Sequence, residues 1–307
     1  MPIPNSSNKN KIITHGSVIQ SFDNIILAIK KQLATNKDIE EREVQLSLLE
    51  HLCDFELGRF LLTNKGLNGY WTNYILTYPH KPKNNDISSL EKMFLEKLPT
   101  MCATQERFDI FLHLNQQQVK NGAKLASIPS GLGGELFYLD LSKNSALELY
   151  LIDLDDLSLD GARLLANEKN VRHKVHYLQE NAWEIQYRNE FDLISSNGIT
   201  IYEPDDNRVI ELFQNFYTAL TSGGMLVTSS LTPPPSVDKA SEWDMSQINL
   251  EMLQLQKILF SDIIQVTWQC FRSSTRIVEM LKSVGFIDIM VDYDAARIFP
   301  TISAKKP

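Results

Sequence analysis

Hydrophobic positions follow two different rhythms along the chain, and the change comes at Ala123. Before that point, apolar residues recur every three or four positions, which is the spacing of one face of a helix. The pattern predicts one helix that starts near Ser17 and a second over residues 39–63, with Gly66 just beyond its end. A third helix is predicted from a capping box at Ser88 through residue 98, and a fourth over residues 104–121. Residues 1–122 are therefore predicted to form a helical N-terminal region.

After Ala123, short apolar runs alternate with segments of helical spacing. Strands are predicted over residues 124–129, 147–152, 174–178, 191–196 and 225–230, and helices over residues 156–166 and 206–220. Strands that alternate with helices in this way form βαβ units, whose parallel sheet is covered by helices on both faces. The predicted fold class is therefore α/β.

The alternation breaks at the run Thr232-Pro233-Pro234-Pro235, and a long apolar-periodic segment then covers about residues 246–268. A helix from Ser274 to a stop at Gly285 follows, and strands over residues 287–292 and 296–303 complete the chain. Residues 123–307 are thus predicted to form one α/β domain that carries a helical insertion at about residues 231–270.

Composition narrows the classes of partner. The net charge is −8 and no run of Lys or Arg stands out, which argues against a nucleic-acid binder. No apolar stretch approaches the ~20 residues that span a bilayer, and the polar residues 1–11 lack the apolar core of a secretory signal. Cys53, Cys102 and Cys270 are far apart and are predicted to be reduced thiols. We expect a cytoplasmic protein with a frayed N-terminus, a small-molecule or protein partner, and no membrane partner.

Patterns typical of metal sites and hydrolytic centres are missing from the sequence. His173 and His176 have the spacing of a metal-binding pair, but no Cys or acidic partner stands nearby, so surface or core positions are expected. No HExxH or CxxC pattern occurs, and no Ser/His/Asp arrangement is evident. No metal is therefore predicted.

A glycine-rich segment, Leu125-Ala-Ser-Ile-Pro-Ser-Gly131-Leu-Gly133-Gly134-Glu-Leu136, joins the first predicted strand to a helix. Glycines let a backbone approach a ligand closely, and a helix N-terminus supplies free N–H donors. Asp153 ends the next strand, 22 positions after Gly131, where a carboxylate can reach a ribose diol. Asp155 and Asp156 compete for this role or cap the following helix, and Asp153 is favoured because it comes first after the apolar run.

The glycine pattern departs from the dinucleotide fingerprint, because Leu136 stands where its third glycine would be. The segment resembles instead the first motif of the class I (Rossmann-like) S-adenosylmethionine-dependent methyltransferases. That motif is a strand followed by an acidic-x-Gly-x-Gly-x-Gly turn. Here Pro129 occupies the acidic position and Glu135 the position of the third glycine.

Later segments resemble the remaining motifs of this family in the right order. Residues 152–163 are similar to its acid-ended second strand with a helix ending in Ala-Arg, and residues 175–183 to its adenine-binding turn, with Asn181 in place of the usual Asp. Residues 191–198 resemble the fourth strand, residues 220–227 the Gly-Gly turn into the fifth, and residues 281–286 the final helix before a closing strand pair. The resemblance covers residues 123–306 apart from the insertion.

The resemblance implies a seven-stranded, mostly parallel sheet with an antiparallel C-terminal strand, capped by the N-terminal helices and the insertion. It implies S-adenosylmethionine as methyl donor and S-adenosylhomocysteine as product. The implied donor-binding residues are Pro129, Ser130, Gly131, Gly133, Asp153, Leu154, Asn181, Ala182, Trp183, Ser196 and Asn197. Methyl transfer from a sulfonium depends mainly on alignment of the reacting groups, so the pattern assigns no catalytic residue.

The same resemblance places the methyl acceptor between the N-terminal helices, the loop after the fourth strand and the insertion. Candidate acceptor-site residues are Tyr70, Trp71, Tyr202 and Trp243, with Tyr74 and Glu203 beside them. Tyr70 and Trp71 follow Asn68-Gly69, which is expected to form a turn just beyond a helix end. Since both helical segments are apolar enough to pack together as a lid, a small-molecule acceptor is expected. The oligomeric state is not indicated by any pattern.

Two other functions share this fold. The substitutions at Pro129 and Glu135 are compatible with a relative that binds the nucleotide without catalysis. An aminopropyltransferase would use a decarboxylated donor and several acidic residues around the acceptor, for which Glu203, Asp205 and Asp206 are the candidates.

Overall fold

Seven strands form a single sheet in the order β3-β2-β1-β4-β5-β7-β6. The computed structural model describes residues 21–82, 86–144, 146–267 and 270–307. The strands are β1 (Lys124–Ser127), β2 (Glu148–Asp153), β3 (Lys174–Gln179), β4 (Phe191–Ser196), β5 (Leu220–Ser229), β6 (Ile287–Asp292) and β7 (Thr301–Lys305). Strands β1 to β5 run parallel, while β7 is antiparallel to both β5 and β6. The predicted Rossmann-like sheet with an antiparallel C-terminal strand is confirmed.

The central strands are apolar on both sides because helices cover both faces of the sheet. Leu149 and Leu151 of β2 pack with α6 (Pro99–Gln116), α7 (Gly134–Phe137) and α8 (Asp156–Glu168). Tyr150 and Ile152, which alternate with them, face α9 (Asp206–Ala219) and α11 (Ser274–Val284). This alternation gives the near-continuous apolar runs from which the strands were predictable.

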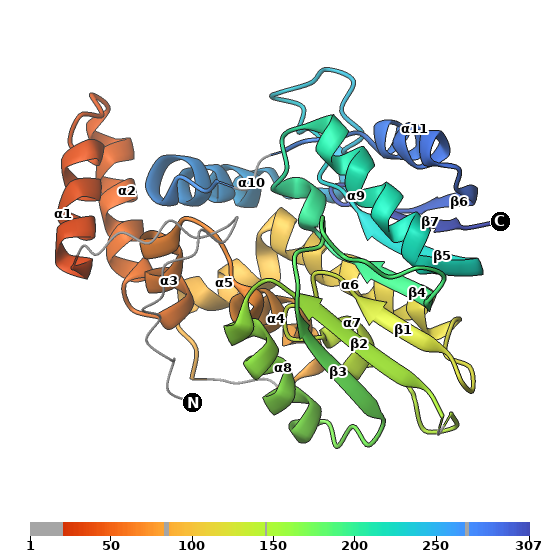
Figure 1. Ribbon diagram of the computed structural model, residues 1–307. Coiled ribbons are helices and arrows are strands. Elements are labelled where there is room, and N and C mark those ends of the chain that lie inside the picture. The colour runs from red at the N-terminus through yellow and green to blue at the C-terminus, as the bar shows by residue number, and fades with distance from the viewer. Residues whose placement is uncertain (1–20, 83–85, 145, 268–269) are drawn as a thin grey trace.

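The strand order reverses between β1 and β4. The chain moves outward from β1 to β2 and β3, then returns to place β4 beside β1 on its other side. Ligands of open α/β sheets bind at such a reversal, beyond the carboxyl ends of the strands. The arrowheads of β1 and β2 point toward α4 in this region (Figure 1).

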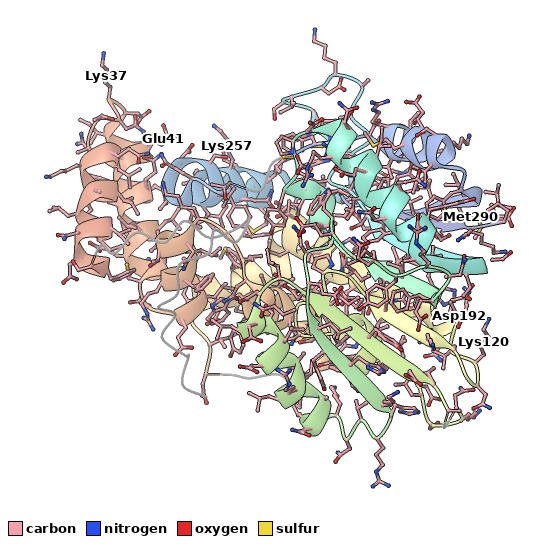
Figure 2. The ribbon with its side chains drawn as sticks, in the orientation of Figure 1. Lys37, Glu41, Lys120, Asp192, Lys257 and Met290 are labelled. Atoms are coloured by element: carbon pink, nitrogen blue, oxygen red, sulfur yellow. The ribbon has the colours of Figure 1, made fainter. Side chains whose placement is uncertain are left out.

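Surface ion pairs lie at the amino ends of β1 and β4, opposite the carboxyl ends that border the strand-order reversal. Lys124 Nζ lies 2.7 Å from Glu190 Oε1, and Lys120 Nζ lies 3.6 Å from Asp192 Oδ1. Figure 2 shows Lys120 and Asp192 together at this end of the sheet, far from α4. Exposed ion pairs of this kind contribute little to stability, about 0–1 kcal/mol each.

The N-terminal part is helical, as predicted. Its helices are α1 (Phe22–Leu33), α2 (Ile39–Leu52), α3 (Glu56–Asn64), α4 (Gly69–Thr77), the short turn η1 (Tyr78–His80) and α5 (Ser89–Lys97). The predicted cap of α5 is confirmed, because Ser88 Oγ accepts a hydrogen bond from the Glu91 N–H at 3.1 Å. The N-terminal residues 1–20, including the expected frayed end and helix start at Ser17, lie outside the described residues.

Three boundaries in this part differ from the prediction. Helix α6 (Pro99–Gln116) begins and ends earlier than the predicted range of residues 104–121, because Pro99 stands in its first turn and the chain leaves the helix after Gln116. Residues 39–63 form two helices, because Phe55 takes an extended backbone and buries its side chain between them. Helix α4 was expected to be a turn at Asn68 and Gly69. Instead, the Asn68 side chain accepts a hydrogen bond from the Trp71 N–H at 2.9 Å, so the Asn-Gly pair begins a helix.

The insertion after β5 packs against the N-terminal helices. It contains η3 (Met245–Gln247), α10 (Leu250–Lys257) and a π-helical segment, η4 (Ile258–Ile264). Leu259, Ile263 and Ile264 share one apolar cluster with residues of α1 to α5. Figure 1 shows α10 running from the sheet domain toward α2. None of the helices in the described part of the chain is long and apolar enough to cross a bilayer.

Candidate functional site

A cavity of about 240 Å³ lies at the carboxyl ends of β1, β2, β3 and β4. Its floor is formed by the loops that follow these strands, and α4 and α6 of the N-terminal region cover it. Ten residues predicted from the family motifs line it: Pro129, Ser130, Gly131, Asp153, Leu154, Asn181, Ala182, Trp183, Asn197 and Tyr202. The loops that follow four different strands therefore meet at one hollow, at the strand-order reversal.

The backbone of the glycine loop packs closely against the start of α4. Gly131 has φ +49°, and a Cβ built on Gly69 would lie 3.1 Å from Gly131 Cα and press against Ser158 Oγ. Only glycine at position 69 allows this approach without moving α4 or α8. Because of it, the N-terminus of α4 forms one wall of the cavity rather than a separate layer.

Asp153 holds the glycine loop in place. Its Oδ2 accepts a hydrogen bond from the Gly131 N–H at 2.8 Å, and its Oδ1 accepts one from the Asp155 N–H at 2.9 Å. Burial raises the pKa of Asp153 to about 6. Asp155 caps α8, accepting from the Leu157 N–H and from Ser158 Oγ. The buried carboxylate at the cavity and the helix cap are thus two different residues.

The turn after β3 places a flat aromatic surface beside the cavity. Asn181 Oδ1 accepts a hydrogen bond from the Trp183 N–H at 3.1 Å, which fixes the turn. The Trp183 indole N–H donates to the Arg208 carbonyl oxygen at 2.8 Å, and its ring belongs to the core under α9. Trp183 therefore both fills the core and borders the cavity.

Gly133 and Ser196 are two predicted donor-site residues that the structure places outside the cavity lining. A Cβ on Gly133 would lie 2.8 Å from Leu151 Cδ1 and 2.9 Å from Phe137 Cε2, so this glycine permits α7 to pack on the sheet. Ser196 is fully buried in β4, while the next residue, Asn197, faces the cavity. Successive residues of an extended chain point in opposite directions, which accounts for this difference.

Three of the four predicted acceptor-site aromatics also lie elsewhere. Tyr70 and Trp71, together with Tyr74, line a separate hollow of about 480 Å³. Thr72 and Leu76 occupy the face of α4 that borders the cavity. Tyr70 and Trp71 were assigned to the acceptor site on the expectation that they follow a turn. Because they lie in helix α4, their side chains point away from the face that carries Thr72 and Leu76.

Trp243, the third of these aromatics, packs within the insertion and does not line the cavity. Its indole N–H donates to Thr232 Oγ1 at 3.0 Å, and its ring packs with Ile248, Phe271 and their neighbours in a small apolar cluster. Of the predicted acceptor aromatics, only Tyr202 lines the cavity. Burial raises its pKa to about 12.

Glu135, the residue at the expected third glycine, is part of the cavity wall. It is buried, and its Oε1 accepts a hydrogen bond from Asn197 Nδ2 at 2.9 Å. Asn197 Oδ1 accepts in turn from Ser229 Oγ at 3.3 Å. Burial raises the pKa of Glu135. The departure from the family motif thus adds a carboxyl group to the site rather than removing a contact.

Arg107 of α6 is one of the lining residues that the sequence patterns missed. It is 5% exposed and faces the cavity with Thr104, one turn earlier on the same helix. Phe111 and Leu114, which continue this face of α6, are buried against the sheet. A cation at a core-facing helical position was the available signal, because such positions are otherwise apolar.

His173 and His176, which have the sequence spacing of a metal-binding pair, each contact a different partner. His176 Nε2 lies 2.8 Å from Glu148 Oε2, and the His176 ring stacks on Tyr150. His173 Nε2 lies 3.0 Å from the Asn144 carbonyl oxygen. Within the described ranges, no group of three or more His, Cys, Asp or Glu residues is arranged to hold a metal ion.

The strand order, the antiparallel β7 and the cavity at the strand-order reversal agree with the fold that the resemblance to the class I methyltransferases implies. No protein-family profile matches the sequence, and no curated protein does. A solved protein from Bordetella parapertussis, described as a possible exported protein, is 38% identical over 93% of this chain and 95% of its own, with a TM-score of 0.88. This chain belongs to the same family as that protein.

Other solved structures are less similar to this chain. An O-methyltransferase family protein from Burkholderia thailandensis is 14% identical over 66% of this chain and 56% of its own, with a TM-score of 0.47. Phosphoethanolamine N-methyltransferase 2 from Haemonchus contortus, solved with S-adenosyl-L-methionine, is 16% identical over 74% of this chain and 62% of its own, with a TM-score of 0.43.

The Bordetella relative overturns the predicted cytoplasmic location. That protein is described as a possible exported protein, and its similarity extends over nearly the whole of both chains. The prediction rested on the lack of an apolar leader, a pattern that reports on one route of export only.

Proposed function

We propose that the protein is an S-adenosylmethionine-dependent methyltransferase that acts on a small molecule. The observation that carries the proposal is the cavity, where the Gly131 loop, Asp153, the Asn181–Trp183 turn and Asn197 meet in the order expected of a donor site. These residues come from the loops after four different strands, so their meeting is not a consequence of any one local motif.

Each of these segments offers the chemistry that one part of the donor requires. The buried carboxylate of Asp153 can accept hydrogen bonds from two ribose hydroxyls. Asn181 and the Trp183 ring provide an amide and an apolar surface suited to adenine. The Gly131 loop permits close backbone approach, and Asn197 marks the end of β4, where the methionine part would lie. The donor supplies an activated methyl group on its sulfonium.

The protein would contribute mainly alignment and exclusion of water. Holding two reactants in line can lower the barrier by about 7–11 kcal/mol. Helices α4 and α6 cover the cavity, and the insertion is tied to this cover because Gln256 Oε1 accepts from the Thr100 N–H at 2.8 Å. We therefore assign residues 1–122 and the insertion as a cap on the catalytic domain, with a chamber suited to a small acceptor.

The first expected result is binding of S-adenosylmethionine and S-adenosylhomocysteine in the micromolar range usual for metabolite sites. Isothermal titration of the purified protein with both compounds measures it. Decarboxylated S-adenosylmethionine, the donor of an aminopropyltransferase, and NAD, the ligand of a dinucleotide-binding enzyme, are titrated for comparison. A protein that binds NAD but neither sulfur compound is not a methyltransferase, and clear preference for the decarboxylated donor indicates aminopropyl transfer.

The affinity for S-adenosylhomocysteine should fall as the pH is lowered through about 6. Burial, with a smaller contribution from Asp155, raises the pKa of Asp153 to about 6, so the ligand-free carboxyl gains a proton below this pH. A protonated carboxyl accepts hydroxyl hydrogen bonds poorly, so the affinity should drop up to about tenfold per pH unit below 6 and stay level above 7. Titrations from pH 5 to 8 test this expectation.

The variant Asp153→Asn is the matched control, because it keeps the shape of the side chain and cannot ionise. Its affinity should be lower at neutral pH and should not show the fall near pH 6. If the natural protein binds more tightly at pH 5 than at pH 8, Asp153 does not bind the ligand in its ionised form.

A further inference from the structure

Arg107 is a buried cation that has no hydrogen-bonded partner in the described part of the chain. Its side chain is 5% exposed and borders the cavity, and the guanidinium carbon lies 4.4 Å from the centre of the Phe299 ring. Among the described residues, no hydrogen bond or ion pair engages the guanidinium, and its Nε and Nη1 are fully enclosed without a partner. Buried polar groups are nearly always hydrogen-bonded, and a buried charge needs this even more.

The neighbouring acidic groups do not fill this need. Glu135 directs Oε1 to Asn197. Asp294 accepts hydrogen bonds from the backbone N–H groups of Ala296, Ile298 and Phe299. Both carboxyl groups lie near enough to affect Arg107 electrostatically, and neither forms an ion pair with it.

The guanidinium keeps its charge in this setting. Burial lowers the pKa of Arg107 to about 10, which still leaves it protonated at neutral pH. Its planar fork of N–H donors matches the two oxygens of a carboxylate. The Phe299 ring holds one face of the guanidinium, so the edges of the fork remain for a ligand.

We propose that Arg107 forms a carboxylate-binding site inside the cavity. The inference rests on the proposed function, because the carboxylate belongs either to the methyl acceptor or to the methionine end of the donor. Both ligands would present a planar anion to the same fork, beside Tyr202 and Glu135. Two binding experiments distinguish the sources.

The first experiment compares S-adenosylhomocysteine with 5′-methylthioadenosine, which has the same nucleoside and sulfur but lacks the amino-acid part. If Arg107 holds the donor carboxylate, Arg107→Met should weaken S-adenosylhomocysteine binding at least tenfold and change methylthioadenosine binding by less than about threefold. Calorimetry of the full-length protein measures both affinities.

The second experiment compares benzoate with benzamide, a neutral molecule of nearly the same shape, with and without saturating S-adenosylhomocysteine. If Arg107 holds the acceptor carboxylate, benzoate should bind at least tenfold more tightly than benzamide. Arg107→Met should remove this preference while the affinity for S-adenosylhomocysteine stays within about threefold.

Two further variants keep the result interpretable. Arg163, which lies over the Tyr177 ring at 4.7 Å on the surface of α8, gives the matched control Arg163→Met, and this change should alter neither comparison. Arg107→Lys keeps the charge without the planar fork and should retain part of the preference, even if Arg107→Met fails to fold.

The outcomes separate the two proposals. The carboxylate site is wrong if Arg107→Met or Arg107→Lys leaves both comparisons unchanged, or if the natural protein itself prefers neither carboxylate-bearing ligand. Failure of the natural protein to bind either S-adenosylhomocysteine or 5′-methylthioadenosine contradicts the proposed function instead. In that case the benzoate comparison without nucleotide still tests Arg107.

Discussion

Replacing Asp153 by alanine should weaken binding of S-adenosylhomocysteine at least tenfold while the protein remains folded. The variant loses an acceptor for two ribose hydroxyls, each a charge-assisted hydrogen bond of about 1.5–3 kcal/mol. It also frees the Gly131 N–H, whose bond to Oδ2 holds the glycine loop. Calorimetry measures the affinity, and circular dichroism with thermal unfolding measures the fold.

The fold should survive this change for an electrostatic reason. The native Asp153 carboxyl has a pKa of about 6, above its ordinary value of 3.8, so the native state binds this proton more tightly than the unfolded chain. Ionisation of Asp153 at neutral pH therefore opposes folding, and its removal takes away that penalty together with the bonds it makes.

Asp155→Ala is the matched control, two residues further along the same loop. Asp155 caps α8, so its loss should lower the free energy of unfolding by about 1 kcal/mol and leave the affinity within a few fold. The assignment of the ribose carboxylate is wrong if Asp155→Ala abolishes binding and Asp153→Ala has no effect.

Leu259→Ala should lower the free energy of unfolding by about 2–5 kcal/mol. Leu259 lies in the π-helical segment of the insertion, is fully buried, and packs in the cluster that contains Leu49 and Leu52 of α2. Truncation would leave a void between parts of the chain that are distant in sequence, because η4 packs against α2 and α3. Denaturant unfolding of the whole protein measures the effect.

Leu250→Ala provides the comparison within the same insertion. Leu250 is 66% exposed at the start of α10, so its truncation should change stability by no more than about 0.5 kcal/mol. Equal effects of the two substitutions would mean that the insertion is not docked on the N-terminal helices.

Much of the sheet domain could be predicted from local patterns. β4 has the predicted bounds, and β2, β3, α8 and α9 lie within a few residues of theirs. Buried strands and amphipathic helices leave periodic signals within about ten residues of chain, so tertiary contacts are not needed to see them. The Asn68-Gly69 pair was misjudged because the same residues that favour a turn also begin a helix.

The sequence by itself determined the α/β class, the order of the motifs and the residues at the strand ends, because these depend on neighbours in the chain. Only the tertiary structure decided which side chains share the cavity. Helix α4 turns Tyr70 and Trp71 away and presents Thr72, while α6 carries Arg107 across the sheet to face Glu135. The rotation of a helix about its axis is set by the surfaces on which it packs, so residues distant in the chain meet only after folding.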